Sequence, residues 1–193
     1  GGKSANVIFE DADLERAATV VLRGSILATG QACQSLERVY IDAAVYAPFM
    51  QRLLEKARGV RITADDPAGQ VGPFIMARQA EIVREHLADA VAKGGGVWCE
   101  PTILSGVNHT MKVMTEETFG PVIPVMPFTT LEEGIRLANE GDYGLSANVL
   151  AGSEAEALAI AERLDAGFVS LNEISMSSFV ADFDESFFAG DGL

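Results

Sequence analysis

Short apolar segments alternate with longer amphipathic segments along the chain. The apolar segments are rich in Val, Ile and Leu and predict strands at residues 6–9, 38–41, 97–99, 102–104, 122–128, 145–150 and 168–171. Between them, apolar residues recur at helical spacing and predict helices that end near residues 27, 58, 93, 139 and 164. Asp11 and Asp13 offer N-caps for the first helix, and capping boxes at Thr130 and Ser153 begin the last two.

This alternation predicts an α/β fold with a mostly parallel sheet and helices on both faces. Pro124 and Pro127 interrupt the strand at 122–128, so we expect a short or edge strand there rather than a central one. We assign residues 1–172 to one domain and 173–193 to an irregular C-terminal segment of the same domain. The aromatic residues of that segment are expected to pack rather than to form a substrate pocket.

Composition narrows the classes of function. The chain has 193 residues, 28 acidic and 14 basic, with a net charge of -14. Such a balance argues against a nucleic-acid partner, because phosphate binding relies on clustered Lys and Arg. No apolar segment is long enough to span a membrane, and no Cys/His spacing predicts a metal site. With two cysteines far apart in sequence, a reducing cytoplasmic compartment is the favoured location.

The segment 30–33, Gly-Gln-Ala-Cys, places Cys33 on a small-residue loop between a predicted helix and a predicted strand. A nest of backbone N–H groups, which Gly30 permits, can lower the pKa of a thiol. The N–H of Cys33 could then stabilise the oxyanion formed when the thiolate attacks a carbonyl. From these residues alone, Cys33 is either a nucleophile or a partly buried structural cysteine.

Other residues that could carry chemistry are more simply explained. Cys99 lies in an apolar segment and is expected to pack in the core. His86 falls in a helical pattern and is predicted to lie on the surface. His109, in a polar stretch, is predicted to be solvated rather than catalytic. Glu116 and Glu117 on their own would be a surface acidic pair.

Several segments in order resemble the catalytic half of the aldehyde dehydrogenase superfamily. They are Gly-Gly-Lys-Ser-Ala-Asn-Val-Ile-Phe at 1–9, Gly-Gln-Ala-Cys at 30–33, Gly-Pro at 72–73, Glu-Pro-Thr-Ile-Leu at 100–104, Glu-Glu-Thr-Phe-Gly-Pro-Val at 116–122 and Tyr-Gly-Leu-Ser-Ala at 143–147. Their order and spacing are far more specific than any one of them. The resemblance implies an enzyme that acts on a small-molecule aldehyde with NAD or NADP as acceptor.

The resemblance also assigns roles to individual residues. It makes Cys33 the nucleophile, which forms a thiohemiacetal and then a thioester. Glu117 matches the carboxylate that hydrogen-bonds the nicotinamide ribose, and Phe119 matches the aromatic residue beside that ribose and ring. Gln79 falls near a position that contacts the cofactor in some members.

Other parts of the family pattern are missing. The chain opens at Gly1 without Met, and we expect it to be part of a longer polypeptide that forms a homo-oligomer. The family's general base, its oxyanion-hole asparagine and most of its cofactor site lie upstream of the Gly-Gly-Lys segment. We therefore expect these residues alone to bind NAD weakly or not at all and to have negligible oxidative turnover. Residues 186–192 also depart from the family's Pro-Phe-Gly-Gly segment, which helps to shape the substrate pocket.

Two alternatives remain. One is a CoA-acylating dehydrogenase, in which a thiol rather than water receives the acyl group. The other is a non-catalytic structural relative, against which the retention of Cys33, Glu117 and Phe119 argues. The sequence does not identify the aldehyde or choose between NAD and NADP.

Overall fold

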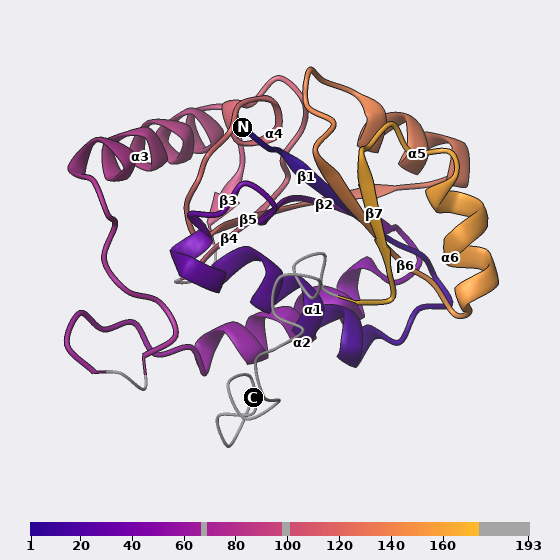
Figure 1. The fold of residues 1–193 in the computed structure, drawn as a ribbon, viewed down its shortest axis with the longest axis horizontal. Helices are drawn as coiled ribbons and strands as arrows, with labels where there is room; N and C mark the ends of the chain where they lie inside the picture. The colour runs from indigo at the N-terminus through magenta and orange to yellow at the C-terminus, as the bar shows by residue number, and fades with distance from the viewer. Residues whose placement is uncertain (67–68, 98–100, 174–193) are drawn as a thin grey trace.

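The computed structural model describes residues 1–66, 69–97 and 101–173 (Figure 1). Seven strands form one sheet in the order β3-β4-β5-β2-β1-β6-β7, and every neighbouring pair except β3 with β4 is parallel. The strands are β1 (Ser4–Ile8), β2 (Leu36–Asp42), β3 (Gly96–Val97), β4 (Thr102–Ser105), β5 (Val122–Phe128), β6 (Ser146–Leu150) and β7 (Phe168–Leu171). The predicted α/β fold with a mostly parallel sheet is confirmed.

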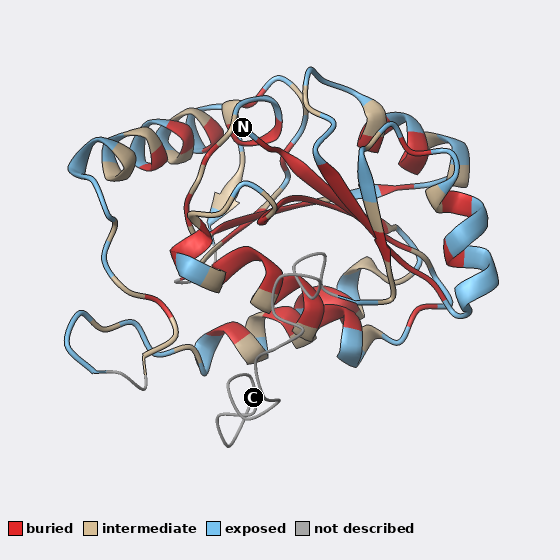
Figure 2. Cartoon of the chain, in the orientation of Figure 1, coloured by how far each residue is buried: buried red, intermediate tan, exposed pale blue. Residues whose placement is uncertain are grey.

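Helices cover both faces of this sheet, also as predicted. They are α1 (Leu14–Ile26), η1 (Leu27–Gly30), α2 (Tyr46–Arg58), α3 (Ala77–Ala92), α4 (Lys112–Thr115), α5 (Leu131–Asn139) and α6 (Glu154–Ala161). One core cluster joins the sheet to α1 and α2, and the other joins it to α3, α4, α5 and α6. Figure 2 shows the central strands buried between these layers. Because both faces are covered, successive residues of β1, β2 and β6 are buried, rather than every second residue.

Local capping explains why several helices begin where the sequence predicts. The Asp13 side chain accepts hydrogen bonds from the N–H groups of Glu15 and Arg16, which caps α1. Thr130 Oγ1 accepts from the N–H of Glu133 at the start of α5. Ser153 Oγ caps α6 by accepting from the N–H of Glu156, and it also donates to the Glu156 carboxylate.

The prediction of a short or edge strand at 122–128 is wrong. The strand β5 has seven residues, is mostly buried, and lies between β4 and β2. Its first part, through Pro124, pairs with β4, and its second part, which carries Pro127, pairs with β2. The two neighbours are thus offset along β5, and the half with Pro127 has a strand on one side only. This offset lets a strand between two others contain prolines at little cost in ladder bonds.

Some sequence predictions fall outside the described residues. They concern Cys99, Glu100 and the aromatic residues of the C-terminal segment from 174 onward. The division into residues 1–172 and 173–193 stays a prediction for the same reason. In the parts of the chain that the structure describes, no helix is long and apolar enough to cross a membrane.

Candidate active site

The predicted site residues gather at the amino ends of adjacent strands. Residues 1–3 lead into β1, 31–35 into β2, 117–121 into β5 and 143–145 into β6. Because these strands are parallel neighbours, the segments before them meet at one edge of the sheet. Ligands in open α/β sheets usually bind at the carboxyl ends of the strands. In this chain the chemistry-bearing residues lie at the opposite edge.

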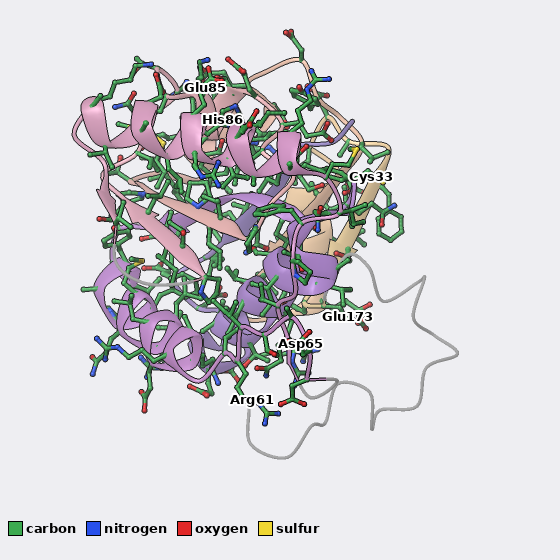
Figure 3. All side chains as sticks on the ribbon, turned by 90° about the vertical axis from the view of Figure 1, so that its left-hand side faces the viewer. Cys33, Arg61, Asp65, Glu85, His86 and Glu173 are labelled. Atoms are coloured by element: carbon green, nitrogen blue, oxygen red, sulfur yellow. The ribbon has the colours of Figure 1, made fainter. Side chains whose placement is uncertain are left out.

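Cys33 lies on the loop between η1 and β2, with its side chain exposed and its thiol free. Figure 3 shows it at the rim of the molecule. The backbone just before it is unusual, because Ala28, Thr29 and Gly30 in succession have positive φ angles of 51°, 60° and 69°. The sequence indicated such freedom at Gly30 alone. Strained backbone of this kind persists only where surrounding contacts hold it, and it clusters at functional sites.

Contacts with distant segments hold the Cys33 loop. Thr29 Oγ1 accepts a hydrogen bond from the N–H of Gly72 at 3.1 Å. Gln31 Oε1 accepts one from the N–H of Ile75 at 3.0 Å. The Gln31 side chain, whose direction the sequence left open, is therefore part of the scaffold that ties the loop to the segment before α3.

The Gly1-Gly2 pair separates the Cys33 loop from Glu117. The N–H of Gly2 donates to Glu117 Oε1 at 2.5 Å. A Cβ atom at Gly2 would lie 1.9 Å from the Cys33 carbonyl oxygen, and one at Gly1 would lie 2.5 Å from the Glu117 carboxylate. Only glycines let the two functional segments approach β1 from both sides.

Phe119 and Gln79 lie around the same segment. Phe119 is half-buried and has a φ angle of 52°, which is uncommon for a residue with a side chain. Gln79 on α3 donates from Nε2 to the carbonyl oxygen of Thr118 at 2.7 Å. The structure thus brings Cys33, Glu117 and Phe119 to one edge, whereas Gln79 contacts the backbone next to Phe119.

Sequence reasoning missed a buried ion pair behind this segment. Lys3 Nζ lies 2.8 Å from Glu37 Oε2, and both side chains are almost fully buried. Lys3 also donates to Thr118 Oγ1 at 3.0 Å. Burial lowers the pKa of the Lys3 amine, and the neighbouring Glu37 carboxylate partly offsets that effect. The pair was missed because the strand prediction began at Arg38 and left Glu37 outside it.

The prediction that His86 lies on the surface is wrong. His86 is 3% exposed and shares the inward face of α3 with Val83 and Ala90. Its Nδ1 lies 3.1 Å from Thr118 Oγ1, and its Nε2 lies 3.5 Å from Glu116. Thr118 Oγ1 thus contacts both the Lys3 amine and the His86 ring. Burial and then the Lys3 charge lower the pKa of His86.

This environment predicts a pH dependence of stability. A histidine whose pKa is lowered on folding takes up its proton more readily in the unfolded chain. The free energy of unfolding should therefore fall as the pH drops below the ordinary histidine value of 6.5, by at most about 1.4 kcal/mol per pH unit. Urea unfolding at a series of pH values measures the slope. The slope should be smaller in the variant His86→Gln, because the titrating ring is removed. An unchanged slope would contradict the assignment of the pH dependence to His86.

His109 is not solvated as the sequence predicted. Its Nε2 lies 2.8 Å from the hydroxyl of Tyr40, and its Nδ1 lies 2.9 Å from Glu140. Burial raises the pKa of Tyr40 to about 12, so this hydroxyl stays protonated and can donate to His109. The hydrogen bond from His109 lowers the pKa of Glu140. These contacts fix the loop before α4 to β2. The partners of His109, Tyr40 and Glu140, are not among the predicted site residues.

The side chains of the predicted site are a thiol, a carboxylate and an aromatic ring. Among the residues that the structure describes, no group of three or more His, Cys, Asp or Glu side chains could hold a metal ion. An exposed cysteine, a carboxylate and an aromatic ring thus lie on segments that meet at one edge of a parallel sheet.

Comparison with known proteins gives the family. The model of the aldehyde dehydrogenase family matches residues 1–185, and the chain belongs to that family. It is 40% identical over 183 residues to a 4,4'-diapolycopene aldehyde oxidase from Methylomonas sp, a match that covers 90% of this chain and 34% of that protein. The chain spans roughly two fifths or less of the length of such relatives.

Solved structures agree with this assignment. The putative aldehyde dehydrogenase PutA from Anabaena variabilis has a TM-score of 0.89 at 43% identity, covering 92% of this chain and 41% of that one. Betaine aldehyde dehydrogenase from Staphylococcus aureus, in complex with NAD+, has a TM-score of 0.86 at 29% identity, covering 90% and 38%. Matched structures of the family contain NAD+ or NADP. The predicted family resemblance is confirmed.

Proposed function

We propose that this chain is the nucleophile-bearing part of an enzyme that oxidises an aldehyde to a carboxylic acid with NAD or NADP. The observation that carries the proposal is the exposed, free thiol of Cys33 on a loop braced from several sides. The Gly2 backbone packs against the Cys33 carbonyl, and its N–H donates to the carboxylate of Glu117. Such bracing supports catalysis because reacting groups must be held in a fixed geometry.

The chemistry assigned to Cys33 is nucleophilic addition. Its thiolate attacks the aldehyde carbon, a carbon–sulfur bond forms, and the carbonyl oxygen becomes an oxyanion that takes up a proton to complete the thiohemiacetal. The backbone N–H of Cys33 would supply a hydrogen bond to that oxyanion. When bound, NAD or NADP would accept a hydride from the thiohemiacetal carbon, and the hydroxyl proton would be released to solvent. Cys33 then holds the acyl group as a thioester until water releases the acid.

Glu117 and Phe119 fit the role of cofactor contacts. The Glu117 carboxylate is half-buried beside Gly1, where the missing side chain leaves room for a carboxylate. Its oxygens can accept hydrogen bonds from ribose hydroxyl groups. The half-buried ring of Phe119 offers an apolar surface against which a flat ring can pack. Gln79 would act through the Thr118 carbonyl rather than on the cofactor itself.

A CoA-acylating enzyme is the alternative that uses the same Cys33 chemistry, with a thiol in place of water in the last step. We favour a reducing, cytoplasmic location, which the free thiol of Cys33 supports. We also propose that the whole protein forms a homo-oligomer. Exposed apolar side chains such as Phe168 on β7 support that assignment, because β7 is the last strand on its side of the described sheet.

Addition of an aldehyde to Cys33 can be tested directly. Incubation with acetaldehyde labelled at its carbonyl carbon should give a thiohemiacetal carbon signal in the NMR spectrum of the native chain. The variant Cys33→Ser should lose that signal completely, and the matched variant Cys99→Ser should keep it. A signal that survives Cys33→Ser, or that requires Cys99, would overturn the assignment of the nucleophile.

A further inference from the structure

Glu37 is the one fully buried carboxylate among the residues that the structure describes, with 2% of its surface exposed. It lies at the start of β2, the strand that follows the Cys33 loop. Burying a carboxylate is costly unless every oxygen finds donors. The contacts that compensate this cost show what the residue does.

Both oxygens of Glu37 accept hydrogen bonds from successive backbone N–H groups. Oε2 accepts from the N–H of Thr118 at 2.7 Å, and Oε1 accepts from the N–H of Phe119 at 2.8 Å. Two neighbouring N–H groups can reach one carboxylate only if the chain turns so that both point the same way. The carboxylate therefore fixes the backbone conformation between the two cofactor-contact candidates, Glu117 and Phe119.

That backbone conformation is strained. Phe119 has a φ angle of 52°, and this left-handed conformation is unfavourable for a residue with a side chain. Such strain persists when surrounding contacts over-determine it. Here the hydrogen bond from the N–H of Phe119 itself to Glu37 opposes relaxation, as does the bond from Gln79 to the Thr118 carbonyl.

Lys3 links the same carboxylate to the segment that carries Gly2. Its amine donates to both Glu37 and Thr118 Oγ1, while the N–H of Gly2 donates to Glu117. Adjacent residues before β1 thus contact two adjacent residues of the segment 117–119, Glu117 and Thr118. Lys3 neutralises the charge of Glu37, and the two carboxylate oxygens still accept hydrogen bonds from the two N–H groups.

We propose that Glu37, paired with Lys3, is a positioning residue that holds Glu117 and Phe119 in the geometry that receives the nicotinamide riboside. This inference rests on the proposed function, because it assumes that Glu117 and Phe119 contact the cofactor. Glu37 touches neither the thiol nor the cofactor in this role and acts only through the backbone of Thr118 and Phe119.

The variant Glu37→Gln tests the proposal. A glutamine has one acceptor oxygen, so at least one of the two N–H groups loses its partner. Nicotinamide mononucleotide is the probe, because it carries the ring and ribose that Glu117 and Phe119 would contact. In the native chain it should shift the NMR signals of the Phe119 ring and of the amides of 117–119. In Glu37→Gln its affinity should fall about tenfold, and amide exchange at Thr118 and Phe119 should accelerate.

Ser25→Ala is the matched control. Ser25 is also buried, and its Oγ donates to the carbonyl of Leu36, the residue before Glu37, at 2.8 Å. This variant should lower the melting temperature without changing affinity for the probe or amide exchange at 118–119. If Glu37→Gln does not fold, the double variant Lys3→Met, Glu37→Gln removes both buried charges and leaves the same acceptor deficit.

The outcomes separate the two claims. Equal affinity of the probe for the native chain and for a folded Glu37 variant would overturn the positioning role alone. A native chain whose Phe119 and Glu117 signals do not respond to the probe would contradict the proposed cofactor contacts, and the positioning role would fall with them. A loss of affinity in Ser25→Ala as large as in the Glu37 variant would show a merely structural role.

Discussion

Replacing Gly30 with alanine is expected to destabilise the chain by about 3 kcal/mol or more. Gly30 has a φ angle of 69°, and a Cβ atom there would lie within 3.0 Å of the backbone of Gly120 and Pro121. Neither backbone segment can move aside easily, because Phe119 is tied to Glu37 on one side and β5 begins on the other. Chemical denaturation of the native chain and of Gly30→Ala measures the difference.

Gly94→Ala is the control that isolates the clash. Gly94 also has a positive φ angle, 94°, but a Cβ atom there would meet nothing within 4 Å. Only the conformational cost of about 1–2 kcal/mol should appear. Equal losses in Gly30→Ala and Gly94→Ala would show that close packing between the Cys33 loop and the segment 120–121 does not contribute.

The parts of the fold that depend on local sequence could be predicted. Asp13, Thr130 and Ser153 cap the helices that the sequence assigned to them, because a cap needs only the next few residues. The buried strands were recognisable because a parallel sheet covered on both faces needs continuous apolar runs. Neither signal requires knowledge of which strands are neighbours.

The position of β5 and the burial of His86 could not be predicted in this way. Whether Pro127 is tolerated depends on where β4 ends relative to β2, which is a matter of register between distant segments. His86 is buried because α3 packs over Thr118 and Lys3, which are far away in the sequence. A helical pattern assigns residues to a face but does not say which polar residue finds a buried partner.

The Lys3–Glu37 pair left a signal that could have been used. Lys3 directly precedes β1, and Glu37 is the second residue of β2. If those strands are parallel neighbours, their starts meet at one edge and opposite charges there will pair. The family resemblance identified Cys33, Glu117 and Phe119, whereas the residues that hold them follow from the contacts in the structure.

Replacing Cys33 with serine is expected to abolish acyl transfer to the chain. With p-nitrophenyl acetate, the thiolate of Cys33 should displace p-nitrophenolate and retain the acetyl group as a thioester. The contacts described for the site provide no base that could activate a serine hydroxyl at this position. The burst of p-nitrophenolate should therefore disappear. Cys99→Ser should retain the burst. The unsubstituted chain, once denatured, should react only as fast as a free thiol.

The most direct test of the account is the position and rate of this acetyl label, measured by peptide mass spectrometry after a short reaction. We expect one thioester per chain, on Cys33, formed faster in the folded chain than in the denatured one. Labelling of Cys99 or of lysines instead, or labelling of Cys33 no faster than in the denatured chain, would contradict the claim that Cys33 is the nucleophile.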